Sequence, residues 1–230
     1  MSGIDKYAVF GNPIKHSKSP LIHALFAEQT TQELIYTAEL VETGQFNSAV
    51  KHFIENNGKG LNITVPFKED AWELAARCSD RAELAGAVNT LVLDPSGRHF
   101  GDNTDGFDLL RDLVVNLGIT IEGTNVLILG AGGATRGIVG PLLEMNPRGL
   151  CIANRTIDKA QIIAEHFERF GPISACGFNM VPVSEPYDLI INATSAGVRG
   201  EIPPYPEAAV SDTTFCYDLS YGLNPTPFST

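Results

Sequence analysis

The sequence predicts an α/β fold built in two parts, and three observations support this. Short apolar runs typical of strands alternate with segments of helical periodicity, a pattern that favours helices packed on mostly parallel sheets. The alternation starts afresh near Asp105, so we place a boundary there, between residues 1–105 and 106–230. With 230 residues, 43% of them hydrophobic, the chain is long enough to bury one or two cores.

The first half opens with three predicted strand and helix pairs. The strands are expected at residues 6–10, 34–40 and 60–65, and the helices at 19–30, 43–57 and 67–77. Pro20 is tolerated in the first turn of its helix, and Gly58 is expected to close the second helix. A further helix is expected at 79–86. Residues 89–94 and 98–102 flank the turn sequence PSG, which predicts a β-hairpin.

The second half begins with a predicted helix at 106–118 that bridges the two parts. Strands are then expected at 125–130, 149–154, 187–193 and 214–220. We find no Pro/Ser linker, low-complexity tract or short repeat between the halves. The second half therefore reads as a further set of strand–helix–strand units.

The stretch VLILGAGGATRG, residues 126–137, joins an apolar strand, a glycine turn and a helix start. Gly130 permits a tight turn, Gly132 lets the backbone approach a pyrophosphate, and the helix from Gly133 points its amides at that anion. Thr135 stands where a third glycine is usual. The context predicts a Rossmann-type dinucleotide site, and the alternative is a plain glycine-rich turn.

The end of the following strand indicates which dinucleotide is bound. An acidic residue that binds a ribose 2′-hydroxyl is expected there, yet Asn154 occupies the position, followed by Arg155 and Thr156. These side chains offer donors and a fixed positive charge, and Lys159 lies one helical turn further on. They predict binding of the 2′-phosphate of NADP. The alternative is that Thr156 only caps a helix while Arg155 and Lys159 are solvated.

Composition excludes several classes of function. The net charge of −11 and the pI near 4.8 disfavour a nucleic-acid or anionic-membrane surface. The four cysteines show no Cys-x-x-Cys pair or metal-like cluster, so we expect no metal and four reduced thiols that mostly serve as buried apolar filler. No signal-peptide pattern and no run of about 18 apolar residues occurs. We expect a cytoplasmic protein, as a monomer or homodimer.

Polar residues gather at the ends of the predicted strands in the first half. Each has an ordinary explanation as a cap, a turn residue or a solvated side chain. Together, beside a dinucleotide site, they indicate a pocket for a small hydroxylated substrate. They are Ser17, Ser19, Asn62, Thr64, Lys68, Asn89 and Asp105.

These motifs together resemble the shikimate dehydrogenase family. The resemblance covers nearly the whole chain, through GNPIKHSKSP, LNITVPFK, GAVNT, GDNTDG, GAGGATRG, ANRT, NATSAG and YDLSYGLNPTPF in that order. It implies reversible reduction of 3-dehydroshikimate to shikimate by NADPH, a step toward chorismate and the aromatic amino acids. It also implies a substrate-binding catalytic domain, residues 1–105, that faces an NADP-binding domain, residues 106–230, across a cleft.

By position, the resemblance assigns roles to particular residues. Lys68 and Asp105 match the catalytic residues. Substrate binding is assigned to Ser17, Ser19, Asn62, Thr64, Lys68, Asn89, Asp105 and Tyr221. NADP binding is assigned to Gly130, Ala131, Gly132, Gly133, Ala134, Thr135, Asn154, Arg155, Thr156, Lys159 and Leu219, with lysine at position 159 where arginine is frequent.

The chemistry of ketone reduction agrees with this assignment. A ketone that takes a hydride needs its developing alkoxide stabilised and then protonated, and the Lys68 ammonium can do both. Two other functions remain: an NAD-dependent quinate/shikimate dehydrogenase, for which we expect an acidic residue within 154–156, and a non-catalytic NADP-dependent sensor, for which we expect loss of Lys68 or Asp105. Neither feature is present.

Members of this family usually continue some tens of residues beyond the position of Thr230. The resemblance implies a Gly-rich segment and a closing helix there, whose glutamine reaches the substrate and to which no residue here can be matched. If Thr230 is the terminus, we expect NADPH binding with weak shikimate binding and slow turnover. If the tail is only missing from the sequence, the intact mass will exceed 24.7 kDa.

Overall fold

The computed structural model describes residues 4–196, 201–221 and 226–228. Parts of the motifs NATSAG and YDLSYGLNPTPF therefore lie outside the described residues. The chain divides into two compact units, Met1–Asp105 and Gly106–Thr230, and we describe each unit by itself. No helix among the described residues is long and apolar enough to cross a membrane.

The first unit is a six-stranded sheet in the order β2-β1-β3-β5-β6-β4. Strands β1, β2 and β3 run parallel, whereas β5 is antiparallel to both β3 and β6. The elements are β1 (Asp5–Gly11), α1 (Ser19–Thr30), β2 (Leu34–Leu40), α2 (Phe46–Glu55), β3 (Gly58–Ile63), α3 (Lys68–Leu74), β4 (Arg77–Cys78), α4 (Asp80–Ala85), β5 (Thr90–Val92) and β6 (Phe100–Asp102).

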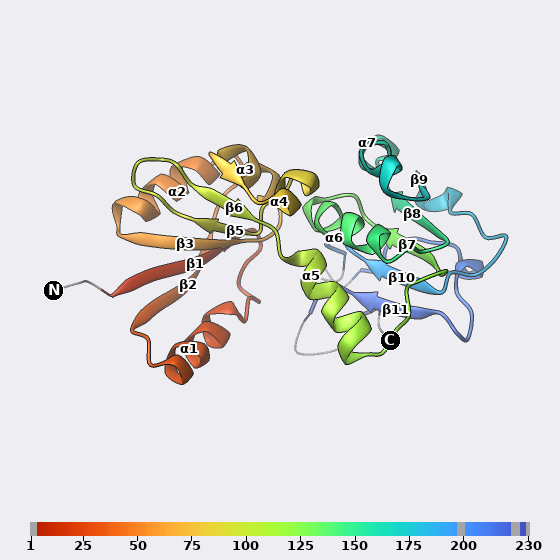
Figure 1. The fold of residues 1–230 in the computed structure, drawn as a ribbon, viewed down its shortest axis with the longest axis horizontal. Helices are drawn as coiled ribbons and strands as arrows, with labels where there is room; N and C mark the ends of the chain where they lie inside the picture. Colours follow the sequence, from red (N-terminus) through yellow and green to blue (C-terminus); the bar gives the residue numbers. More distant parts are fainter. Residues whose placement is uncertain (1–3, 197–200, 222–225, 229–230) are drawn as a thin grey trace. The chain divides into compact units, whose positions relative to one another are not determined.

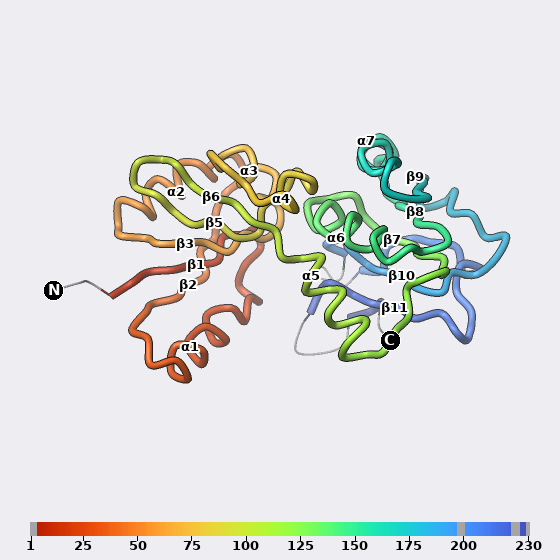
Figure 2. Tube along the Cα trace, in the orientation of Figure 1, coloured from red at the N-terminus to blue at the C-terminus, as the bar shows by residue number. Residues whose placement is uncertain are grey.

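The core of the first unit lies between this sheet and helices α2 to α4. Phe10 on β1 packs edge-on against Phe46 of α2, and Phe46 stacks on Phe67 just before α3. Helix α1 lies on the opposite face of the sheet, as Figures 1 and 2 show, and Ala27 is the one residue that it buries. The buried face thus fixes the carboxyl ends of β1 and β3, from which the polar motifs extend.

The second unit is a five-stranded parallel sheet in the order β11-β10-β7-β8-β9. Chain order leads from β7 outward to β9 and then returns to β10 on the other side of β7, which makes the β7/β10 pair a topological switch point. The elements are α5 (Asp105–Leu110), a π-helical segment (Arg111–Asn116), β7 (Asn125–Leu129), α6 (Gly133–Glu144), β8 (Gly149–Asn154), α7 (Ile157–Phe167), β9 (Ile173–Gly177), β10 (Leu189–Asn192) and β11 (Phe215–Asp218), with short 3-10 turns at Glu168–Phe170, Phe178–Met180 and Glu207–Ala209.

The predicted α/β fold class is confirmed, and most predicted elements are present. The helix at 19–30 and the strand at 34–40 have the predicted bounds, and β5 and β6 form the predicted hairpin. Ser79 caps α4, because its hydroxyl accepts from the Ala82 amide, and Gly86 ends that helix with φ 59°. Ser79 and Gly86 therefore mark the two ends of this helix.

Several expected boundaries were wrong. Helix α2 ends at Glu55 and Asn57 takes the left-handed conformation (φ 66°), so Gly58 starts β3 instead of closing the helix. Helix α3 stops at Leu74, because Arg77–Cys78 pairs with β6 as β4. The first sheet is mixed, and β9 was not predicted, since its sequence ISACG has no extended apolar run.

The cysteines agree only in part with their expected role as buried filler. All four are free, and Cys151 is buried whereas Cys78, Cys176 and Cys216 are half-buried. Burial, and the neighbouring Cys151 thiol, raise the pKa of Cys176 to about 12. A thiol in that state is a poor nucleophile at neutral pH.

Candidate active site

The loops that follow β1 and β3 lie together at the carboxyl edge of the first sheet. The Thr64 amide donates to the Phe10 carbonyl oxygen at 2.9 Å, and the Asn12 amide donates to the Val65 carbonyl oxygen at 2.9 Å. These backbone bonds hold the GNPIKHSKSP loop beside LNITVPFK. The two motifs are far apart in sequence and become neighbours because β1 and β3 are parallel partners.

Lys68 and Asp105 form an ion pair in the first unit. Lys68 is the first residue of α3, and its Nζ lies 2.5 Å from Oδ2 of Asp105, the first residue of α5. Only 12% of the Lys68 side chain and 20% of the Asp105 side chain are exposed. An ion pair this sheltered has little water between its charges, so the two groups fix one another's position.

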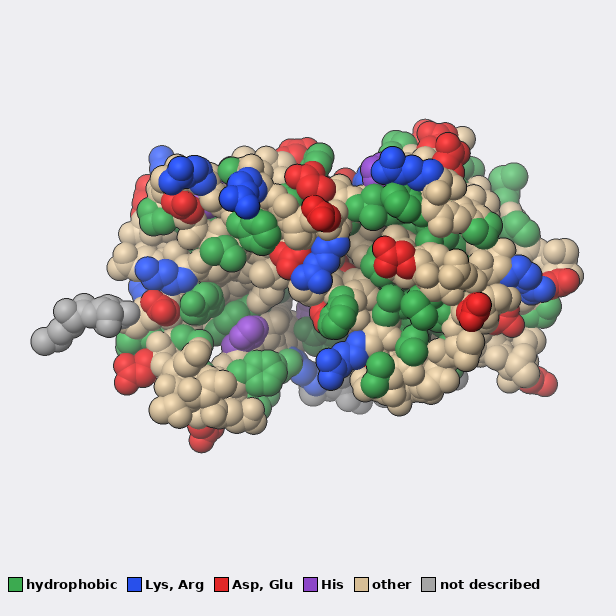
Figure 3. Space-filling model, viewed as in Figure 1, with side chains coloured by type: hydrophobic (Ala, Val, Ile, Leu, Met, Phe, Trp, Pro, Cys, Tyr) green, Lys and Arg blue, Asp and Glu red, His purple; other side chains and the backbone are tan. Residues whose placement is uncertain are grey.

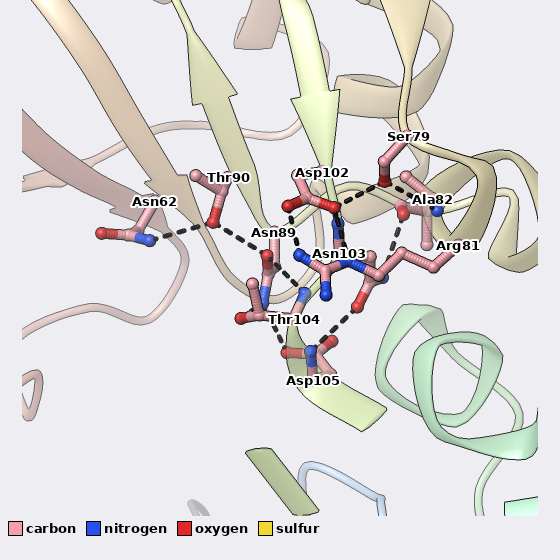
Figure 4. Close-up of polar contacts among 11 residues, drawn as sticks. Asn62, Ser79, Arg81, Ala82, Asn89, Thr90, Asp102, Asn103, Thr104 and Asp105 are labelled. Atoms are coloured by element: carbon pink, nitrogen blue, oxygen red, sulfur yellow. Dashed lines mark hydrogen bonds and ion pairs between the residues drawn. The ribbon is translucent and has the colours of Figure 1, made fainter. Parts of the chain in front are cut away.

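Asn89 holds the other oxygen of that carboxylate. Its Nδ2 donates to Asp105 Oδ1 at 2.9 Å and to Thr104 Oγ1 at 3.0 Å, while its Oδ1 accepts from the Thr104 amide at 3.2 Å. Figure 4 shows the Asn89 side chain directed at the turn that carries Thr104 and Asp105. Asp105 is thus oriented from two sides, by Lys68 and by Asn89.

Asn103 fixes the same turn from within, and the motif analysis did not identify it. It is 3% exposed, its Nδ2 donates to the Ala87 carbonyl oxygen at 2.9 Å, and its Oδ1 accepts from the Asp105 amide at 3.0 Å. A buried asparagine with both ends bonded is a strong positional constraint. Its place in GDNTDG, two residues before Asp105, was the available signal.

Asp102 anchors the strand that leads into this turn. It accepts from the Ser79 hydroxyl at 2.5 Å and from two guanidinium nitrogens of Arg81 at 2.7 and 2.5 Å (Figure 4). These hydrogen bonds, led by those from Arg81, lower the pKa of the Asp102 carboxyl to about 2. The Asp102 backbone carbonyl oxygen also accepts from the Asn89 backbone N–H at 3.0 Å. This bond connects Asp102 directly to the polar cluster around Asp105.

Ser17 and Ser19 lie in the loop before α1 and are half-buried. The Ser19 amide donates to Ser17 Oγ at 3.3 Å. Among the described residues, no hydrogen bond joins either serine to the Lys68 and Asp105 cluster. Thr64 is likewise half-buried and directly follows β3, and no side-chain hydrogen bond joins it to that cluster within the described part of the chain.

The glycine turn of the second unit connects β7 to α6. Gly130 has φ +110°, and a Cβ there would lie 3.0 Å from the Ala193 carbonyl oxygen, at the β7/β10 switch point. Gly132 is the N-cap of α6, and a Cβ built on it would meet no atom of the described residues within 4 Å. The first turn of α6 has no acidic residue. Open space before amides at a helix N-terminus fits a pyrophosphate.

Thr135 takes the place of the usual third glycine without disturbing this turn. Its side chain is fully buried, and its hydroxyl donates to the Gly130 carbonyl oxygen at 2.9 Å. The hydroxyl therefore closes the loop from inside. Ala131 is buried beside it, whereas Gly133 and Ala134 are half-buried at the helix start.

The end of β8 presents the four residues expected to recognise a 2′-phosphate. The Asn154 Nδ2 donates to the Thr156 carbonyl oxygen at 2.8 Å, which shapes the turn into α7. Thr156 is the N-cap of α7, but its hydroxyl makes no capping bond. Arg155 and Lys159 are exposed and have no carboxylate partner among the described residues. The missing capping bond goes against a capping role for Thr156, whereas the exposure of Arg155 and Lys159 agrees both with an anion site and with solvated side chains.

Asn192, at the end of β10, is a buried residue that was not singled out. It is 0% exposed, its Nδ2 donates to Asp218 Oδ1 at 3.2 Å, and its Oδ1 accepts from the Thr194 hydroxyl at 2.7 Å. The Leu219 amide donates to the Asn192 carbonyl oxygen at 3.0 Å. Asn192 thereby fixes the loops after β10 and β11, which carry Leu219 and Tyr221, and Tyr221 is 52% exposed.

Comparison with known families matches both units. Residues 9–91 match the model for the shikimate dehydrogenase substrate binding domain, and residues 113–199 match the model for shikimate / quinate 5-dehydrogenase. A protein of Methylococcus capsulatus named shikimate dehydrogenase (NADP(+)) is 54% identical over 99% of this chain and 81% of its own length.

Solved structures show the same similarity. The crystal structure of an Ael1 enzyme from Pseudomonas putida is 42% identical with a TM-score of 0.83, over 97% of this chain and 82% of that one. A shikimate 5-dehydrogenase from Thermus thermophilus, solved in complex with NADP(H) and shikimate, is 31% identical with a TM-score of 0.79, over 96% of this chain and 80% of that one.

Proposed function

This chain belongs to the shikimate dehydrogenase family, and from that premise we propose that it interconverts 3-dehydroshikimate and shikimate with NADP as cofactor. The observation that carries the proposal is the sheltered Lys68–Asp105 pair, held by Asn89, because it supplies an acid and an acceptor side by side. We further propose residues 1–105 as the substrate-binding catalytic domain and 106–230 as the NADP-binding domain.

Lys68 is the proposed proton donor of the reduction. As hydride reaches the carbonyl carbon, negative charge develops on the oxygen, and an ammonium within hydrogen-bond reach stabilises that charge and then gives up a proton. In the reverse direction the Lys68 amine takes the proton from the substrate hydroxyl. Asp105, fixed by Asn89, accepts a hydrogen bond from a neighbouring substrate hydroxyl and so sets the ring in place.

The remaining polar residues of the first unit are proposed to bind the substrate's other groups. Ser17, Ser19 and Thr64 offer hydroxyls from adjacent loops, and Asn62 offers an amide at the end of β3. Both hydrogens of the Asn89 amide are already bonded to Thr104 and Asp105, so its main contribution in this structure is orientation of Asp105. A rigid constellation of this kind favours one orientation of a hydroxylated ring.

NADPH supplies the hydride when it is bound. Gly130, Gly132 and the α6 amides, from Gly133 through Thr135, would hold its pyrophosphate. Asn154, Arg155, Thr156 and Lys159 would hold its 2′-phosphate, and Leu219 and Tyr221 are proposed to lie near the nicotinamide. No acidic residue stands within 154–156, which supports NADP over NAD.

Surface and cysteine properties support a small-molecule enzyme. Acidic and basic side chains are interspersed on the face shown in Figure 3, which is unlike a continuous nucleic-acid-binding surface. The four free cysteines support a cytoplasmic location. A monomer or homodimer, without nucleic-acid or membrane partners, remains part of the proposal.

Initial-rate measurements on the purified chain test the function directly. Shikimate and quinate are each offered with NADP and with NAD over a range of concentrations, and formation of reduced nicotinamide is followed. We expect shikimate with NADP to give the largest kcat/KM. A larger value with quinate, or with NAD, would favour the quinate/shikimate alternative, and no turnover with any pair would reject the proposed activity.

A further inference from the structure

A continuous hydrogen-bonded chain leads from β2 to the Lys68–Asp105 pair, and one threonine hydroxyl is its central connection. Thr90 is the first residue of β5 and lies directly opposite Asn62 on β3 and Asp102 on β6. Its Oγ1 is 2.9 Å from Asn89 Oδ1 and 3.4 Å from Asn62 Nδ2. Figure 4 shows the side chains of Asn62, Thr90 and Asn89 in a row, from β3 to the start of β5.

The direction of every bond in this chain follows from groups that cannot reverse their roles. The Thr104 amide can only donate and the Asp105 carboxylate accepts, so Asn89 must turn its Oδ1 to Thr104 N and its Nδ2 to Asp105. The Thr90 hydroxyl must then donate its single hydrogen to Asn89 Oδ1. Its lone pair is left to accept from the Asn62 amide.

The same reasoning fixes Asn62. Because its Nδ2 faces Thr90, its Oδ1 faces the Tyr36 hydroxyl, which donates to it at 2.6 Å. His23 stacks on the Tyr36 ring at 4.0 Å and holds that ring in place. The second hydrogen of the Asn62 amide has no partner among the described residues, so it is available to a substrate oxygen.

We infer that Thr90 is a positioning residue of the substrate site: its hydroxyl locks the amides of Asn62 and Asn89 in the orientations that present one donor to substrate and one to Asp105. Thr90 need not touch the substrate to do this. Its effect on kinetics rests on the proposed function, whereas its effect on the two amides does not.

Three variants separate the hydroxyl from the rest of the side chain. Thr90→Val keeps the shape and removes the hydroxyl, whereas Thr90→Ser keeps the hydroxyl and removes a methyl group. Thr37→Val is the matched control, because Thr37 is a half-buried strand threonine of the same unit, and among the described residues no side-chain hydrogen bond links it to Tyr36, Asn62, Thr90 or Asn89. If Thr90→Val does not fold, Thr90→Ser and Thr90→Ala, which differ only by the hydroxyl, give the same comparison.

The orientation of the Asn62 and Asn89 side-chain amides can be followed by their signals in NMR spectra of the intact ¹⁵N-labelled chain. We expect Thr90→Val to shift both signals and speed their exchange with solvent, and Thr90→Ser and Thr37→Val to leave them near wild type. In turnover, we expect kcat/KM for shikimate to fall about 3- to 10-fold in Thr90→Val, which corresponds to one net hydrogen bond, with unchanged NADP affinity.

The results distinguish this inference from the proposed function. Unchanged amide signals in Thr90→Val, or equal changes in Thr90→Ser, would overturn the positioning role whatever the activity. An altered amide pattern confined to Thr90→Val, in a chain whose wild type does not oxidise shikimate, would uphold the positioning role and reject the proposed function instead. A Thr90→Val variant with shifted amide signals and a wild-type kcat/KM would show that the orientation of these amides does not affect substrate binding or turnover. That result would also overturn the inference.

Discussion

The charged residues of the two candidate sites, one at Lys68 and Asp105 and the other at the end of β8, are held in opposite ways. In the first unit the charged groups already have partners: Lys68 with Asp105, and Arg81 with Asp102, each in a network of further bonds. At the end of β8 in the second unit, Arg155 and Lys159 are exposed cations without carboxylate partners among the described residues. The first candidate site is held by internal bonds, whereas the second presents charge that has no carboxylate partner among the described residues.

This difference agrees with the roles proposed for the two sites. Catalysis requires groups fixed within a fraction of an ångström of a productive geometry, so internal bonds that restrict their motion are useful. Phosphate binding is strongest when its donors have no existing ion pair to break. A guanidinium already bonded to a carboxylate would have to lose that bond before it could bind the phosphate. Substitutions in the two sites are therefore expected to affect different measurable quantities.

The largest expected effect is on turnover, after removal of Lys68. Lys68→Ala should lower kcat about 10²-fold or more, the usual scale for loss of a general acid, while NADP affinity stays near wild type. Lys51→Ala, at an exposed position on α2, is the control for loss of a surface lysine in the same unit. Near-native turnover in Lys68→Ala would show that the ordered pair is structural and not catalytic.

Removal of Arg155 should act on binding and leave chemistry intact. Arg155→Ala is expected to weaken NADPH by about 1.5–3 kcal/mol, the range for hydrogen bonds to charged groups, and to change NADH binding much less. Titration calorimetry with both cofactors measures this. Arg148→Ala is the matched control, since Arg148 lies at the opposite end of β8 and pairs with Glu185. Equal losses of affinity for NADPH and NADH would mean that Arg155 does not bind the 2′-phosphate.

The two glycines of the β7 to α6 turn should separate folding from cofactor binding. Gly130→Ala forces a side chain into positive φ beside Ala193, which is expected to cost about 1–3 kcal/mol of stability and lower Tm by several degrees.

Gly132→Ala gives the complementary result. Its new Cβ meets nothing within 4 Å among the described residues, so Tm should stay near wild type, while NADPH binding weakens because the Cβ occupies the proposed approach to the pyrophosphate. Thermal unfolding with and without NADPH measures both variants. A stable Gly132→Ala with native NADPH affinity would place the pyrophosphate elsewhere.

Local patterns were sufficient to predict the glycine turn of the second unit, but not the hydrogen-bonded connections of the first. The turn from Gly130 to Thr135 needs only residues adjacent in sequence, because strand, glycine turn and helix start are consecutive. The role of Thr90 was not predicted, because it arises from the antiparallel pairing of β5 with β3, which places Thr90 opposite Asn62, 28 residues away in sequence. Spacing alone cannot report such a register.

Individual site residues were easier to identify than their connections. Lys68 and Asp105 were both named from motifs, yet the bonds from Asn89 and Asn103 that fix Asp105 depend on the hairpin folding back on the turn. Short elements were also missed for a physical reason. The two-residue strand β4 exists only because β6 lies beside it, and no local propensity marks Arg77 and Cys78 as a strand.

The smallest expected effect tests how far the ordering of the first site depends on Asp102. Its pKa is lowered to about 2, chiefly by hydrogen bonds from Arg81, against about 3.8 when unperturbed. A carboxyl with a depressed folded-state pKa adds stability above its unfolded pKa and loses it as pH falls through the folded value.

The contribution of Asp102 to stability should therefore be complete above about pH 4 and decline between pH 4 and 2. Because 48% of the Arg81 side chain is exposed to solvent, we expect this contribution to the unfolding free energy to be no more than about 1 kcal/mol. Urea unfolding of wild type and Asp102→Asn should show a difference in unfolding free energy that shrinks over that interval. A wild-type advantage over Asp102→Asn that persists unchanged at pH 2 would mean that Arg81 and Ser79 do not stabilise the charged carboxylate, and that the ordered site is held by its amide network alone.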